Sequence, residues 1–110
     1  MDNKIKKISD IPLEKYEYAE YRHIFETNNL KMSYVSVFPK CEVPKHSHEN
    51  EEQTYIILEG EGELLLGKEK IYVSEGYAVF IPAGMEHSIK NNSGNKELKY
   101  IYFVSFIKNK

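Results

Sequence analysis

Two of the chain's four histidines, His46 and His48, are separated by a single residue. In a β-strand, side chains two residues apart point to the same face, so these imidazoles would project together. Such a pair binds a transition metal when further ligands arrive from neighbouring strands. Alone, an H-x-H pair is weak evidence, because imidazoles are also common on surface turns. The pair therefore has two interpretations, a metal site or ordinary polar residues on a turn.

Two other residues bear on that choice. Gln53 begins the next expected strand and shares a face with Tyr55 and Ile57. His87 follows a Pro-x-Gly turn, which could direct its ring back toward the histidine pair.

The elements that must position these side chains are strands. Tyr, Ile, Val and Phe gather in short runs bounded by Gly, Pro, Asn and Ser. The runs are "LKMSYVSVF", "QTYIILEG", "ELLLG", "KIYV", "YAVFIP" and "KYIYFVSFI". Strands so short and so regularly spaced predict one all-β domain, a sandwich or barrel rather than a parallel sheet with helices.

Taken together, the two histidine-containing segments resemble the paired signature motifs of the cupin superfamily. The first fits H-x-H-x4-Q-x6-G from His46 to Gly60, and the second fits G-x5-P-x-G-x2-H-x3-N from Gly76 to Asn91. The resemblance implies a small single-domain cupin of the type-2 conserved barrel kind, a double-stranded β-helix or jelly-roll barrel. It also implies a divalent transition metal (Zn, Ni, Mn, Fe or Cu) near the barrel mouth, held by the residues matching His46, His48, Gln53 and His87.

The sequence departs from the cupin motif at two positions. Lys40 replaces the glycine expected to open the first motif, and Gln53 stands where most metal cupins have glutamate. A shift of one residue would make Glu52 the ligand, but it would also turn Tyr55 and Ile57 outward, so Gln53 is preferred. Three neutral imidazoles and an amide leave the charge of a divalent ion uncompensated. Such an ion would be a stronger Lewis acid and would hold an anionic substrate well.

Large side chains near these motifs suggest a substrate pocket. The expected lining residues are Met32, Tyr34, Tyr55, Phe80 and Tyr102. No catalytic residue is assigned. The closing strand has no charged residue between Tyr100 and Ile107, which leaves metal-bound water, tyrosine hydroxyls and Lys108 as acid–base candidates. His23, which lies outside both motifs, is expected to have no functional role.

The preferred function is a metal-binding small cupin that binds or acts on a small molecule. The alternative is a non-catalytic ligand-binding or sensing barrel. Two further enzymatic alternatives follow from the resemblance: a cupin that opens or isomerises a uronate or other sugar acid, and a cupin dioxygenase. The sequence leaves open whether the protein is an enzyme.

Composition sets the remaining expectations. The chain has 110 residues and a net charge of −2, with Lys and Arg spread along it, which argues against nucleic acid as a partner. No apolar stretch is long enough to span a membrane, no signal peptide is expected, and the single cysteine precludes an internal disulfide. A cytoplasmic location is therefore expected. Residues 1–28 are predicted to form an N-terminal arm and first strand in contact with a second copy, and residues 29–110 the barrel of a homodimer.

Overall fold

The computed structural model describes residues 4–107, which form two β-sheets preceded by a short 3-10 helix at Ile8–Asp10. All strand pairings are antiparallel. The strands are β1 (Glu14–Lys15), β2 (Ala19–Glu26), β3 (Leu30–Val37), β4 (Glu42–His46), β5 (Glu51–Glu59), β6 (Glu61–Leu66), β7 (Glu69–Ser74), β8 (Ala78–Ile81), β9 (His87–Lys90) and β10 (Leu98–Phe106). The all-β prediction is confirmed.

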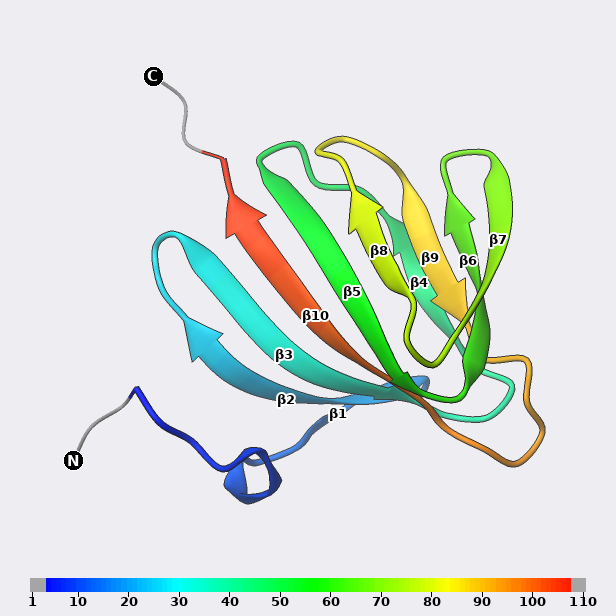
Figure 1. Ribbon diagram of the computed structural model, residues 1–110, viewed down its shortest axis with the longest axis horizontal. Helices are drawn as coiled ribbons and strands as arrows, with labels where there is room; N and C mark the ends of the chain where they lie inside the picture. The colour runs from blue at the N-terminus through cyan, green and yellow to red at the C-terminus, as the bar shows by residue number, and fades with distance from the viewer. Residues whose placement is uncertain (1–3, 108–110) are drawn as a thin grey trace.

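The two sheets face each other and enclose the core (Figure 1). One sheet has six strands in the order β1-β2-β3-β10-β5-β8, and the other has four in the order β4-β9-β6-β7. Consecutive strands therefore often lie in different sheets, as in a jelly roll. The last strand, β10, pairs with both β3 and β5, so it holds together the middle of the larger sheet.

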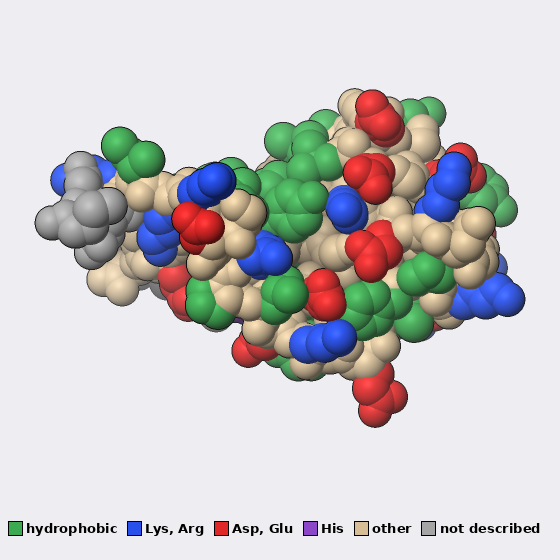
Figure 2. Space-filling view, turned by 90° about the horizontal axis from the view of Figure 1, so that it is seen from below, with side chains coloured by type: hydrophobic (Ala, Val, Ile, Leu, Met, Phe, Trp, Pro, Cys, Tyr) green, Lys and Arg blue, Asp and Glu red, His purple; other side chains and the backbone are tan. Residues whose placement is uncertain are grey.

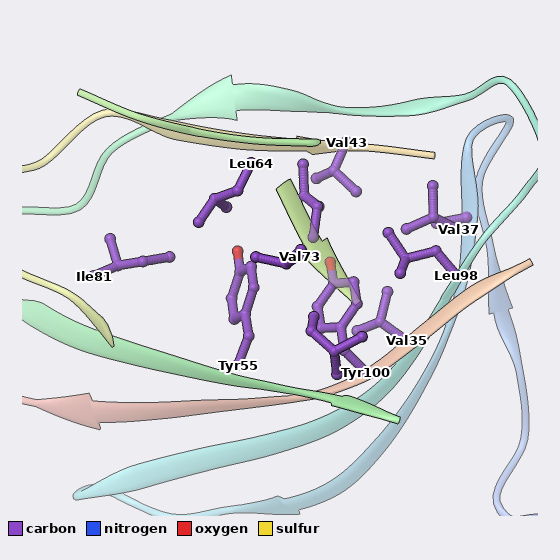
Figure 3. Close-up of a cluster of buried hydrophobic side chains, with 12 residues drawn as sticks. Val35, Val37, Val43, Tyr55, Leu64, Val73, Ile81, Leu98 and Tyr100 are labelled. Carbon is purple, nitrogen blue, oxygen red and sulfur yellow. The ribbon is translucent and has the colours of Figure 1, made fainter. Parts of the chain in front are cut away.

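Strand alternation builds the core from both sheets. In β5, residues 53, 55 and 57 are buried whereas residues 52, 54, 56 and 58 are exposed. Tyr55 and Tyr100 rise side by side from the larger sheet toward the smaller one, with ring centroids 4.7 Å apart (Figure 3). Val43, Leu64 and Ile89 close the core from the other sheet. Two fully buried tyrosines in so small a core give its interior a polar component.

The N-terminal segment extends the larger sheet within the same chain. β2 pairs with β3 from Ala19 to Glu26, and β1 pairs with β2 at the sheet edge. The division into residues 1–28 and 29–110 stays a prediction, as does contact of the arm with a second copy. Residues 1–3 and 108–110, including Lys108, lie outside the described part of the chain.

Charges of both signs are interspersed on the end of the molecule shown in Figure 2, where lysine and arginine lie among aspartate and glutamate. In residues 4–107, no helix is long and apolar enough to cross a membrane. The cytoplasmic location stays a prediction.

The turn between β5 and β6 depends on Gly60. Its φ is +86°, and a Cβ at this position would lie 2.6 Å from the carbonyl oxygen of Glu97. Gly76 has a similar φ of +91°, but a Cβ there would have no atom within 4 Å. Comparing substitutions at the two glycines therefore distinguishes the effect of backbone strain, present at both, from that of steric overlap, present only at Gly60.

We predict that Gly60→Ala destabilises the protein more than Gly76→Ala. Gly76→Ala should lower the free energy of unfolding by about 1–2 kcal/mol, the cost of a left-handed backbone for a residue with a Cβ. Gly60→Ala adds a clash with the backbone and should cost more. Urea denaturation followed by circular dichroism measures both values, and equal losses would contradict the role given to the Glu97 contact.

Candidate metal centre and adjoining cavity

The four residues proposed as metal ligands come from segments that meet at one end of the barrel. His46 ends β4, Gln53 lies near the start of β5, and His87 opens β9. His48 lies beyond β4 in the connection to β5, not in a strand as the sequence analysis assumed. The β4–β5 and β8–β9 connections lie together at the upper end of the barrel in Figure 1. A hydrogen bond of 2.8 Å from the Gly84 amide to the His48 carbonyl ties them together.

The three imidazoles form a cluster. His46 and His87 are cross-strand partners, and their ring centroids are 4.2 Å apart. The rings of His46 and His48 are 5.1 Å apart. The structure thus brings together the histidine pair and the more distant His87.

Hydrogen bonds fix the tautomers of two of these rings. His46 Nδ1 lies 2.8 Å from the carbonyl oxygen of Pro44, and His87 Nδ1 lies 2.9 Å from that of Met85. A carbonyl only accepts, so each Nδ1 carries a proton, and in the neutral ring each Nε2 then presents a lone pair. Backbone hydrogen bonds of this kind orient metal-ligating histidines.

Two buried acceptor atoms in this region have no hydrogen-bond partner within the described part of the chain. They are Nε2 of His87 and Oε1 of Gln53. The amide nitrogen of Gln53 donates to Oε1 of Glu51 at 2.7 Å, so the amide oxygen is the free end. Because buried polar atoms are normally satisfied, these two lone pairs are available to a bound cation, a hydrogen-bond donor or a water molecule.

Gln53, and not Glu52, faces the interior. Gln53 is 2 % exposed, whereas Glu52 is on the outer face. This follows from strand alternation, since Tyr55 and Ile57 are buried on the same side as Gln53.

Glu51 is a site residue that the sequence analysis missed. Two residues before Gln53, it shares the inner face; its Oε1 accepts from Gln53 and lies 3.8 Å from His48 Nε2. The expectation of an uncompensated charge stays a prediction, and Glu51 bears on it because its carboxylate lies beside Gln53 and His48. The period-2 pattern that placed Gln53 inside could also have placed Glu51.

Burial lowers the pKa of His87, and the neighbouring His46 and His48 lower it further. The neutral form is the one that can bind a metal. Nevertheless, within residues 4–107 no three or more His, Cys, Asp or Glu side chains are arranged so as to hold a metal ion as they stand. The residues lie together as a cluster, not as a formed coordination site.

A cavity of about 360 Å³ adjoins this cluster. His46 and Pro44 form part of its wall, and Tyr55, Tyr100 and Tyr102 form another part. The rings of Tyr55 and Tyr102 stack 5.9 Å apart. Two of the five side chains expected to line a pocket therefore do line this cavity.

The other three expected pocket residues lie on the opposite face of the larger sheet. Met32 and Tyr34 alternate with the buried Ser33 and Val35, so they point outward, and Tyr34 lines a separate hollow beside Arg22. Phe80 alternates with the buried Ile81 and is 53 % exposed. The error has one cause: large apolar character was taken as a sign of the interior, but alternation decides the face.

The fold and the clustered imidazoles define a small antiparallel β-barrel that has a cluster of polar side chains at one end, next to its cavity. The family described as "Cupin domain" matches residues 33–104. The chain belongs to the cupin family. The predicted family and jelly-roll architecture are thus confirmed.

Three known proteins show how the chain compares within that family. An uncharacterized protein of Aquifex aeolicus is 32 % identical over 103 residues, covering 93 % of this chain and 85 % of its own. A predicted oxalate decarboxylase of Thermotoga maritima superposes with a TM-score of 0.87 at 24 % identity, covering 94 % of this chain and 99 % of its own. KdgF of a Halomonas species superposes with a TM-score of 0.81 at 20 % identity, covering 92 % and 91 %. Both structures establish similarity of fold.

The buried tyrosines predict a loss of stability at alkaline pH. Burial raises the pKa of Tyr102 to about 12 and raises the pKa of Tyr55 and Tyr100 further. In the unfolded state, tyrosine has a pKa of about 10. Above that pH the unfolded state therefore binds fewer protons than the folded state. The stabilisation is complete below pH 10 and declines as pH rises through the folded pKa values.

Urea unfolding at a series of alkaline pH values measures this decline. Tyr102→Phe should make it shallower, whereas Tyr72→Phe, at a side chain that is 73 % exposed, should not. An identical slope in the Tyr102→Phe variant and the wild type would contradict the assignment.

Proposed function

We propose that this cupin binds one divalent transition metal through His46, His48, Gln53 and His87 and holds a small anionic molecule in the adjoining cavity. The observation that carries the proposal is the pair of buried, unpartnered acceptors, His87 Nε2 and Gln53 Oε1. An amide oxygen and neutral imidazoles are donors that first-row divalent ions accept.

The contacts around these atoms support a common ligand set. In their neutral forms, His46 and His87 present Nε2 lone pairs, because backbone carbonyls accept from their Nδ1 atoms. The ring of His46 lies near those of both His48 and His87, and Gln53 is connected to His48 through Glu51. The side chain of His48 is 46 % exposed, so its ring can turn to complete a site without disturbing the core.

Glu51 adds the negative charge that this ligand set lacks. Its carboxylate accepts from the Gln53 amide and thereby orients the amide oxygen away from itself. A carboxylate next to the ligands would also attract the cation electrostatically. When bound, the ion would supply Lewis acidity toward an anionic oxygen ligand.

The cavity wall carries charges of both signs, since Lys31 and the Glu14 carboxylate both line it. Lys31 can pair with a carboxylate of a bound molecule, and the rings of Tyr55 and Tyr102 add aromatic surface. A volume of about 360 Å³ matches the lower end of small-ligand pockets, which span roughly 300–1,000 Å³. The cavity therefore fits a small organic acid.

We predict that the protein, loaded with divalent metals and then desalted, retains one first-row metal ion per chain. His87→Ala and the double variant His46→Ala/His48→Ala should lose it, since each removes donors from the cluster. Plasma mass spectrometry measures the content. His23→Gln is the matched control, because His23 also lines the cavity but lies outside the cluster.

Two outcomes would contradict the proposal. Metal content unchanged in His87→Ala would show that the ligand set is wrong. Absence of metal from the loaded wild-type protein would favour the non-catalytic ligand-binding barrel.

We further predict that Glu51→Gln weakens metal binding by about tenfold or more, the usual effect of changing a residue that supports metal ligands. Glu52→Gln removes the same charge from the next residue, but on the outer face, and should have a much smaller effect. Competition with a chromophoric chelator measures both dissociation constants. Equal dissociation constants for the two variants would exclude a specific role for Glu51.

A further inference from the structure

A second hydrogen-bonded group lines the same cavity, away from the metal-binding cluster. His23 in β2 lies between Ser33 of β3 and Glu14 of β1. Its Nδ1 is 2.8 Å from Ser33 Oγ, and its Nε2 is 2.8 Å from Glu14 Oε1. Three strands thus contribute one side chain each to a continuous chain of hydrogen bonds.

The chemistry of the end groups fixes the direction of these hydrogen bonds. The Glu14 carboxylate only accepts, so His23 Nε2 carries a proton and donates it. A neutral imidazole then has its lone pair at Nδ1, which accepts from the Ser33 hydroxyl. The His23 hydrogen bond lowers the pKa of Glu14, and so does a 2.9 Å hydrogen bond from the Tyr16 hydroxyl. The carboxylate is therefore kept charged and aligned with the imidazole.

This group faces the cavity. Ser33 is 1 % exposed and His23 is half-buried, and both form part of the cavity wall that also includes His46. Cross-strand register places His23 opposite Ser33, Ser33 opposite Tyr102, and Tyr102 opposite Tyr55. From Ser33 to Tyr55 is two strand spacings, about 10 Å. Gln53 is two residues from Tyr55 on the same face, so the serine and the histidine cluster lie on one inner face with the stacked rings of Tyr102 and Tyr55 between them.

The outer face of β3 offers a contrast. Ser36 also donates to a carboxylate, Glu97 Oε1, at 2.7 Å, but it lies on the side of the sheet away from the cavity and contacts no histidine. A serine–carboxylate hydrogen bond of that kind can serve only to stabilise the sheet. The inner group differs because it places a histidine between the two and turns its serine toward the cavity.

We infer that Ser33, His23 and Glu14 form a proton relay that acts on a small carboxylate bearing a carbonyl group beside a C–H bond. Ser33 Oγ accepts the proton from that carbon while the Ser33 proton passes to His23 Nδ1. The C–H electron pair moves into the carbonyl to form an enolate, and Glu14 stabilises the resulting imidazolium. Return of the proton to the same or a neighbouring carbon completes an exchange or an isomerisation, with no oxidant or reductant required.

The substrate class follows from the cavity. Lys31 attracts a carboxylate, and the tyrosine rings of the wall accept a short carbon chain. The relay supplies only proton transfer, so the reacting bond must be one whose proton can be removed as an enolate forms. This inference rests on the proposed function in one respect, that the cavity holds a small anionic molecule. Ser33 is the catalytic residue, His23 accepts its proton, and Glu14 positions His23.

Proton exchange in deuterium oxide tests the relay without knowledge of the natural substrate. The full chain is incubated with pyruvate, 2-oxobutyrate or D-galacturonate, and loss of the C–H signal beside the carbonyl is followed by proton NMR. We expect the wild type to accelerate exchange of at least one acid. Ser33→Ala and His23→Gln should each slow the protein-dependent rate by about 100-fold, the lower end for loss of an acid–base group.

Three further variants separate catalysis from folding. Ser33→Thr keeps the hydroxyl and should retain exchange that Ser33→Ala loses. Ser36→Ala removes the matched outer serine and should exchange at the wild-type rate. Glu14→Gln should reduce the rate at saturating acid and leave the half-saturating concentration of acid unchanged, as expected of a residue that orients His23 and does not bind the acid.

Several results would overturn the relay: no acceleration by the wild type with any of the three acids, undiminished exchange in Ser33→Ala, or equal losses in Ser33→Ala and Ser36→Ala. Metal content is measured on the same samples. Exchange without bound metal would contradict the proposed metal site and leave the relay standing. Bound metal without exchange would contradict the relay and leave the proposed metal site standing.

Discussion

Strand alternation is the constraint on which the rest of this structure depends. Side chains two residues apart share a face, so each inner position is set by the register of its strand. In β5 this places Glu51, Gln53 and Tyr55 along one line, and in β10 it places Tyr100 and Tyr102 beside them. A one-residue slip in β5 would exchange Gln53 for Glu52 and expose the tyrosine core. The same pairing that buries the apolar residues therefore determines which polar groups meet.

The interior produced in this way contains several polar side chains, among them Ser33, Gln53, His87, Ser88 and Asn91. Most are satisfied locally, as when Asn91 donates to the carbonyls of Val37 and Lys96 and accepts from the Ser93 amide. Gln53 Oε1 and His87 Nε2 are the exceptions among the residues described. Unpaired lone pairs in a buried site are costly, so they are retained where a ligand completes them. Satisfying these two acceptors would contribute favourably to the free energy of binding a cation.

The cavity has different chemistry at its two sides. One side has His46, and beyond it lie the other two imidazoles, the Gln53 amide and the Glu51 carboxylate, which would suit a cation and its anionic ligand. The other has the Glu14–His23–Ser33 hydrogen bonds, which suit movement of a proton. The tyrosine row between them supplies apolar surface of limited reactivity, since burial raises the pKa of these phenols. A molecule held between the sides would meet charge stabilisation and proton transfer together.

The sequence by itself determined the fold class, the cupin family and the inward position of Gln53, because these depend on local periodicity and on motifs within short segments. It also suggested correctly that His87 lies near the histidine pair, since the Pro-x-Gly turn constrains the chain over a few residues. Only the tertiary structure decided which large side chains line the cavity. Tyr34 and Phe80 have the right size and character, but alternation turns them outward. The hydrogen bonds of His23 could not be predicted from the sequence, because its partners lie 9 residues before it and 10 residues after it, on two other strands. Hydrogen bonds between side chains on different strands depend on register across a whole sheet, and that register is fixed by the packing of the complete core.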